Sequence, residues 1–192
     1  MFFTEKLSHE TKKHVIILTV LFVASAVLGY SAATSHPEEA SKLLGTILRD
    51  IKERIGSLDK ASLFLFIFGT NTAKTFLAMV FGTFFGIASV LFVIFNGFIL
   101  GLAGTLIAFS EGVRFFTLGI GPHGIFEIPG AILASAYGLM LGKASFRKLR
   151  GRGPFMPALL TALRQFGVVV LPLLAIAAFI EVFVTRALVR GA

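Results

Sequence analysis

A few ionisable side chains lie inside the apolar stretches of this sequence, and they are the residues best suited to chemistry. His123 and Glu127 are four residues apart, so a helix would place them on one face. Lys74 is the single charged residue between positions 61 and 109. A charged group inside a bilayer costs at least about 2.5 kcal/mol and is normally paired or turned towards a cavity. We therefore expect Lys74 to meet a carboxylate, first that of Glu127 and second that of Glu181.

Two asparagines should reach a similar depth in the membrane, where an amide side chain often bonds to a neighbouring helix. The expected intramembrane polar cluster therefore has six members: His123, Glu127, Lys74, Asn71, Asn96 and Glu181. Within it, Glu181 is expected to meet His123, Arg114 or Arg186. One interpretation of the cluster is a polar clasp that fixes one packing of the helices. The other is a site on the path of an ion or small solute.

A metal centre is not expected from these residues. Zinc sites use three or four ligands supported by a second shell of partners, and at this depth the sequence offers at most His123, Glu127 and Glu181. The sequence has no H-E-x-x-H motif and no cysteine. We expect no metal, no cofactor and no enzymatic activity, and an intramembrane metal hydrolase ranks third among the hypotheses.

The composition assigns the chain to the integral membrane proteins. Of its 192 residues 56% are apolar, with 22 Phe and 20 Gly, and the mean hydropathy is +0.89. A soluble domain could not hide that much apolar surface. The net charge of +8 comes from basic residues beside apolar runs, a placement typical of membrane orientation rather than nucleic-acid binding. The lipid bilayer is therefore the first expected partner.

The apolar runs predict an all-α polytopic bundle of about five transmembrane helices in a single domain covering residues 1–192. The expected spans are residues 15–33, 62–81, 86–109, 122–142 and 158–184. The first run could instead be a signal peptide, but we expect it to be kept as a span. The block 61–109 could instead cross once and then re-enter the membrane near Asn96. We expect two antiparallel helices joined by a turn near Gly82–Gly86.

The fourth span should be broken or kinked. Pro122 suits the first position of a helix and Gly124 follows it, whereas Pro129 lies inside the apolar run and should bend or split the helix there.

An amphipathic helix is expected between the first two spans, over residues 36–55. Its apolar residues recur at steps of three and four, while basic and acidic residues alternate on the rest of its surface. Such a helix can lie flat among lipid headgroups, pack over the mouth of the bundle, or pair with another copy of itself. In each case it offers a surface to protein partners.

The segment that follows the fourth span is strongly basic. Residues 143–152 include no acidic residue and five basic ones, Lys143, Arg147, Lys148, Arg150 and Arg152. The positive-inside rule places residues 143–157 in the cytoplasm. The number of crossings then puts the N-terminus in the cytoplasm and the C-terminus outside, and makes the amphipathic helix extracytoplasmic. The five basic side chains could set orientation alone, or could also contact anionic lipid headgroups.

Pairs of glycines four residues apart occur in three apolar segments: Gly82 and Gly86, Gly97 and Gly101, Gly138 and Gly142. Small residues at this spacing let helix backbones approach closely in lipid. We expect these glycines to pack the helices of one subunit, with self-association as the alternative, and we expect the protein to form a homo-oligomer.

Several of these residues together resemble the stage II sporulation protein M family. The most specific element is Pro122-His123-Gly124-Ile125-Phe126-Glu127-Ile128-Pro129, an H-G-x-x-E-x-P motif. It is accompanied by Asn71, the Asn96-Gly97 pair and the glycines named above, and the match is strongest over residues 62–145.

The resemblance implies a polytopic membrane protein. In spore-forming bacteria it implies an anchor in an engulfment complex that recruits peptidoglycan-degrading partners. The expected function is therefore a non-enzymatic membrane scaffold, and the alternative is an ion or small-solute channel or transporter that uses His123, Glu127 and Lys74.

Overall fold

Five long apolar helical rods build the protein. The structure is a computed structural model that describes residues 9–185 and residue 188, and within them it is helical with no strand. The helices are α1 (His9–Ser35), α2 (Pro37–Ile55), α3 (Lys60–Phe81), α4 (Ile87–Ser110), α5 (Val113–Leu149), α6 (Met156–Gln165) and α7 (Leu171–Phe179). Two π-helical segments, η1 (Phe166–Val170) and η2 (Ile180–Thr185), join α6 and α7 into one rod and extend it.

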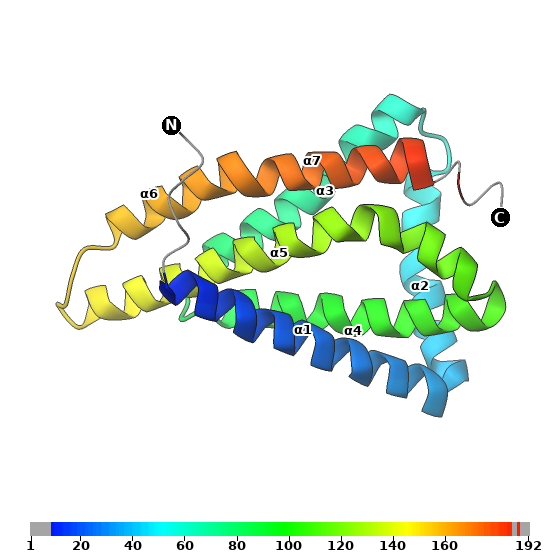
Figure 1. The fold of residues 1–192 in the computed structure, drawn as a ribbon, viewed down its shortest axis with the longest axis horizontal. Helices are drawn as coiled ribbons and strands as arrows, with labels where there is room; N and C mark the ends of the chain where they lie inside the picture. The colour runs from blue at the N-terminus through cyan, green and yellow to red at the C-terminus, as the bar shows by residue number, and fades with distance from the viewer. Residues whose placement is uncertain (1–8, 186–187, 189–192) are drawn as a thin grey trace.

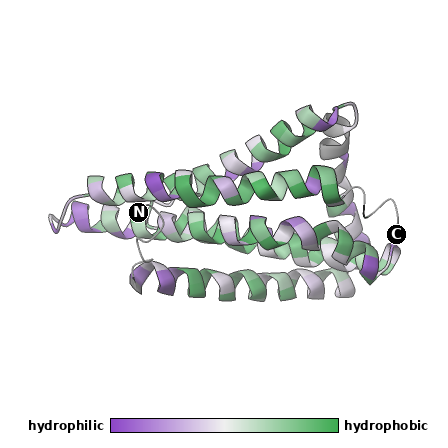
Figure 2. Cartoon of the chain, turned by 45° about the horizontal axis from the view of Figure 1, so that its top comes forward, coloured by the Kyte–Doolittle hydropathy of each residue, from purple (hydrophilic) through white to green (hydrophobic). Residues whose placement is uncertain are grey.

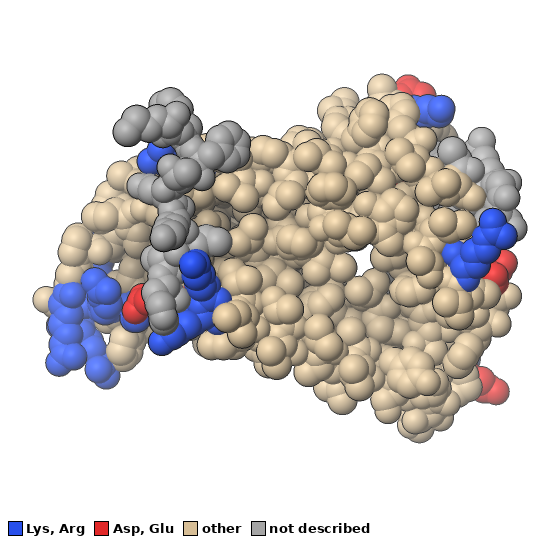
Figure 3. All heavy atoms as spheres, in the orientation of Figure 1, with Lys and Arg blue, Asp and Glu red and all other residues tan. Residues whose placement is uncertain are grey.

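The arrangement of the rods is that of a membrane bundle, which confirms the predicted fold class. The five rods have 22 to 37 residues, and a helix needs about 20 residues to cross the hydrocarbon layer. Figure 1 shows them side by side, with α2 lying across one end, opposite the link between α5 and α6. Apolar residues fill the middle of the rods in Figure 2. On the face drawn in Figure 3, basic and acidic side chains gather at the two ends and leave an uncharged belt between them.

The block 61–109 folds as two helices, so the alternative with one crossing and a re-entrant loop is wrong. Helix α3 ends at Phe81 and α4 begins at Ile87, on either side of the expected turn. The turn reverses the chain through two residues in the left-handed region, Phe85 with φ 58° and Gly86 with φ 81°. At the other end of α3, the Asp59 carboxylate accepts a hydrogen bond from the Ser62 backbone N–H at 2.8 Å, which holds the pKa of Asp59 below its usual value.

Helix α5 begins nine residues earlier than predicted and continues through both prolines. Gly112, with φ 93°, turns the chain after α4, so the helix can start at Val113. Pro122 therefore lies inside the helix, and the expectation that it occupies a first position is wrong. Each proline removes one backbone hydrogen bond, which bends a helix without ending it. Accordingly, α5 is unbroken but changes direction in its first half (Figure 1).

The last rod also contains a proline, and a π turn precedes it. The Leu171 N–H bonds to the Phe166 carbonyl, five residues back, one residue before Pro172. The wider turn fits the chain around a residue that cannot donate a hydrogen bond. A second π turn, η2, follows α7 and carries Glu181 and Thr185.

Glycines hold the helices close together. Gly97 and Gly101 of α4 face the backbone of α1 at Phe22 and Ala26, where an added Cβ would overlap carbonyl oxygens. The other four predicted packing glycines form one seam between the α3–α4 turn and α5: Gly82, Gly86, Gly138 and Gly142. All six therefore lie in contacts between helices of the same chain, and a second copy would have to bind through other surface.

Helix α2 covers almost all of the segment expected to be amphipathic. Its buried residues Ala40 and Leu44 pack against Ala33 of α1 and Leu102 of α4. Of the three arrangements considered, these contacts correspond to packing over the end of the bundle.

Candidate functional site

Three ionisable side chains from two rods meet inside the bundle. His123 and Glu127 lie on α5, one helical turn apart, and Glu181 lies on η2. One ring nitrogen or carboxylate oxygen from each residue lies within 4.8 Å of those of the other two, and all three side chains are half-buried. Of the three expected partners of Glu181, His123 lies in this cluster, and Arg186 lies outside the described residues.

A fourth polar residue, Thr185, lies beside this cluster. Its Oγ1 is 3.5 Å from Nδ1 of His123, and the residue is only 7% exposed. Glu181 and Thr185 are four residues apart on one rod, and they face His123 and Glu127, which have the same spacing on α5. Sequence reasoning did not include Thr185, although its spacing from Glu181 is the signal that could have identified it.

Lys74 approaches the cluster from α3 without joining it directly. Its ammonium group attracts the Glu127 carboxylate only at longer range, so the expected contact with the first of its two partners is not formed. Lys74 stays beyond ion-pair distance of Glu127, whereas Lys143 and Glu10 form a direct ion pair elsewhere in the bundle. The Lys74 side chain is exposed on the surface of the bundle.

The two asparagines of the predicted cluster lie on different helices, and Asn96 differs from the expectation of a bond to a neighbouring helix. Asn96 is exposed on α4 and donates its amide to the Phe92 carbonyl at 2.7 Å, within its own helix and not to another helix. Because the side chain is exposed, a carbonyl of its own helix serves as the acceptor. Asn71 is half-buried on α3, one turn before Thr75, whose hydroxyl donates to the Asn71 carbonyl at 2.6 Å.

The depth of the cluster follows from the length of α5. Glu127 is 14 residues from Val113 and 22 residues from Leu149, which corresponds to about 21 Å and about 33 Å of helix. The cluster therefore lies in the half of the bundle nearer α2. Water is scarce at such a depth, so polar groups there need partners within the protein or a bound ion.

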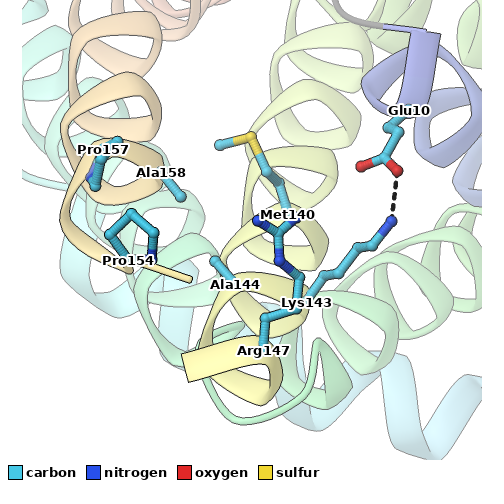
Figure 4. Close-up of a pocket in the computed structure, with 8 residues that line it drawn as sticks. All are labelled: Glu10, Met140, Lys143, Ala144, Arg147, Pro154, Pro157 and Ala158. Carbon is cyan, nitrogen blue, oxygen red and sulfur yellow. Dashed lines mark hydrogen bonds and ion pairs between the residues drawn. The ribbon is translucent and has the colours of Figure 1, made fainter. Parts of the chain in front are cut away.

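A second polar region lies at the opposite end, where α5 leaves the bundle. Lys143 donates to the carboxylate of Glu10 on α1, and together with Arg147 these residues line a cavity of about 200 Å³ that Pro154 and Pro157 also line (Figure 4). The guanidinium of Arg150 lies 4.1 Å from the centre of the Phe146 ring, and the ammonium of Lys148 lies 6.0 Å from that of Phe155. Arg152 is exposed just after them. This end therefore has a dense positive surface with aromatic rings among the charges.

Comparison with known proteins agrees with this architecture. Residues 18–186 match the stage II sporulation protein M family. An uncharacterized protein of Methanocaldococcus jannaschii is 26% identical over 175 residues, which cover 89% of this chain and 93% of that protein. No solved structure is significantly similar to the chain. The family match spans nearly the whole bundle and includes His123, Glu127 and Glu181, and the protein is therefore an integral membrane member of the stage II sporulation protein M family.

Proposed function

We propose that the protein is a non-enzymatic membrane scaffold whose docking platform is α2. The observation that carries this proposal is the position of α2, which lies across one end of the bundle (Figure 1). Ala40 and Leu44 anchor it to the rods below. The bundle then acts as a rigid membrane anchor for whatever binds the platform.

The exposed surface of α2 carries charges of both signs. Glu38, Glu39, Lys42 and Arg49 are all exposed. Such a surface is unsuited to the hydrocarbon layer, and it gives a protein partner several charged groups with which to form complementary contacts. A folded, mixed-charge protein surface is therefore the kind of partner that fits.

The proposed orientation places α2 outside the cell and the Lys143–Arg152 segment in the cytoplasm. The chain lacks cysteine, so a single introduced cysteine can be labelled without any reaction at native thiols. We expect Ser41→Cys to react with a membrane-impermeant maleimide in intact cells and Lys148→Cys to react only after the membrane is opened. Labelling of Lys148→Cys in intact cells would contradict this orientation.

A photo-crosslinking amino acid on α2 tests the scaffold proposal. We expect a crosslinker at Lys42 to give a discrete protein adduct in native membranes, and the charge reversal Glu38→Lys with Glu39→Lys to reduce it. The matched control is a crosslinker at Leu91, which is 60% exposed on α4 and should reach only lipid. The proposal fails if Lys42 yields the same products as Leu91.

A channel or transporter is the second candidate, because the polar cluster places ionisable groups where solute sites of transporters are found. Under this alternative, purified protein in liposomes would carry protons or cations, and Glu127→Gln would stop the flux. If wild-type protein shows no flux of protons, Na⁺ or K⁺ beyond empty liposomes, the transport alternative is ruled out and the scaffold proposal is unaffected.

A further inference from the structure

We propose that His123, Glu127 and Glu181 bind one divalent transition-metal ion, with Zn²⁺ as the first candidate. This proposal replaces the expectation that the chain lacks a metal centre, which rested on the small number of suitable ligands that the sequence offers at this depth. It is independent of the scaffold function, because it concerns the interior of the bundle and not the surface of α2.

The distances between the three side chains are close to those of a metal site. In a tetrahedral zinc site with bonds of 2.0–2.1 Å, neighbouring ligand atoms are about 3.4 Å apart. Here the three candidate ligand atoms lie within 4.8 Å of one another. Side-chain rotation can close a gap of that size, because each of the three residues has rotatable bonds beyond its Cβ atom.

The two backbones hold the ligands in a defined arrangement. His123 and Glu127 project from successive turns of α5, and Glu181 projects from η2, which packs against α5. Short π turns inside long helices occur frequently at functional sites, where the wider turn redirects a side chain. Glu181 lies in such a π turn, which directly follows α7.

Thr185 supplies the outer contact that metal-binding histidines usually have. A histidine ligand commonly donates its second ring N–H to an oxygen, which fixes the tautomer and the orientation of the ring. His123 Nδ1 is 3.5 Å from Thr185 Oγ1, and Thr185 is buried. A proton on Nδ1, donated to that hydroxyl, makes Nε2 the nitrogen that can bind a cation.

The donor set and its charge favour a divalent ion of the zinc or iron type. Imidazole nitrogen suits Zn²⁺ or Fe²⁺ better than Ca²⁺ and Mg²⁺, which prefer oxygen ligands alone. Two carboxylates and one divalent cation sum to zero charge, which lowers the cost of placing the carboxylates in the membrane. Lys74 attracts Glu127 from beyond ion-pair distance, so its charge opposes a cation without occupying the site.

Metal binding can be measured directly on the full chain in detergent, after removal of any histidine tag. We expect about one zinc ion per chain by elemental analysis after reconstitution, and Co²⁺ to give visible absorption bands of an N/O-coordinated site. Glu127→Gln, Glu181→Gln and His123→Asn should each weaken binding at least about 10-fold. The matched controls Glu111→Gln and His36→Gln change exposed residues outside the cluster and should bind like the wild type.

Two further variants keep the proposal testable if a ligand variant does not fold. Thr185→Val should lower Zn²⁺ affinity about 10-fold, with recovery in Thr185→Ser, which restores the hydroxyl. Lys74→Met should raise affinity, because it removes a competing positive charge, and Zn²⁺ should raise the melting temperature of the wild type after chelator treatment. The proposal is overturned if the wild type binds neither Zn²⁺ nor Co²⁺, or if the controls lose binding as the ligand variants do.

Discussion

Residues 113–129 and 130–149 belong to one continuous helix, α5, but their surroundings differ sharply. Every buried residue of α5 except Gly124 lies between Gly130 and Ala144. This later half is rich in Ala, Gly and Ser and packs against α1, α3, α4 and the last rod. The earlier half is bent, largely half-buried, and carries His123 and Glu127.

The difference shows how one membrane helix can combine two roles. In the later half, backbones approach so closely that side-chain volume decides which residues fit. In the earlier half, the prolines move the helix away from tight packing, and polar side chains find space and partners. Steric changes should therefore dominate in the later half, and changes of charge in the earlier half.

A matched pair of glycine substitutions tests this contrast with the largest expected effect. A Cβ at Gly138 would overlap the Ser89 hydroxyl and lie 3.1 Å from the Met79 carbonyl, whereas a Cβ at Gly124 would meet nothing closer than 3.6 Å. We expect Gly138→Ala to lower the free energy of unfolding in detergent by up to about 3 kcal/mol.

Gly124→Ala is the control, and it should be neutral or stabilising by up to about 1 kcal/mol, the gain in helix propensity. Thermal unfolding monitored by circular dichroism measures both. Ser89→Gly should partly rescue Gly138→Ala, because it removes the overlapping hydroxyl. Equal losses from the two alanine variants would show that the two halves do not differ in packing.

The later half of α5 could be predicted from the sequence better than the earlier half. Glycine spacing identified Gly138 and Gly142 as packing residues, because close approach of helices requires small side chains whatever the partner is. The sequence could not show that their partners are Gly82 and Gly86, since that pairing depends on the turn after α3. The sequence did not indicate that Ser89 packs in this seam, because a single serine in an apolar helix has no distinctive spacing.

In the earlier half, the sequence predicted the chemistry but not the assembly. The spacing of His123 and Glu127 placed them on one face, and the similar depth of Glu181 made it a possible partner. The position of Thr185 beside His123 depends on the π turn that contains Thr185 and on how the last rod packs against α5. No local sequence pattern encodes either feature. The start at Val113 was missed because Pro122 resembled a helix start more strongly than Gly112 resembled a turn.

A change of charge in the earlier half should have the second-largest effect. Glu127→Gln removes the charge that Lys74 attracts and that lies beside His123. We expect the free energy of unfolding to fall by about 2 kcal/mol, because the remaining polar groups lose a partner at depth.

The measurement is made with a chelator present, so that a bound metal does not contribute. Glu111→Gln, an exposed carboxylate at the end of α4, is the control and should leave the melting temperature unchanged. If Glu127→Gln has the same melting temperature as the wild type, the cluster does not act as a clasp that fixes the packing of the helices.

Two fully buried serines give a third, smaller test. Ser89 and Ser135 are both 0% exposed, but only Ser89 has a hydrogen-bond partner, donating to the Ala78 carbonyl at 2.8 Å. Ser89→Ala should cost about 1 kcal/mol, whereas Ser135→Ala should cost nothing or stabilise slightly, because it removes an unsatisfied hydroxyl. A loss in Ser135→Ala as large as that in Ser89→Ala would mean that a polar group matters in the later half of α5 as it does in the earlier half.

The smallest effect is expected where α5 leaves the bundle. The ion pair of Lys143 with Glu10 joins side chains that are 48% and 58% exposed, so water screens it and the ordering of two long side chains offsets much of the attraction. Glu10→Gln should therefore lower the free energy of unfolding by less than about 0.5 kcal/mol, and added salt should erase even that. A loss as large as that of Glu127→Gln would place Lys143 in a low-dielectric environment. A change of charge would then lower the free energy of unfolding equally in the two halves of α5.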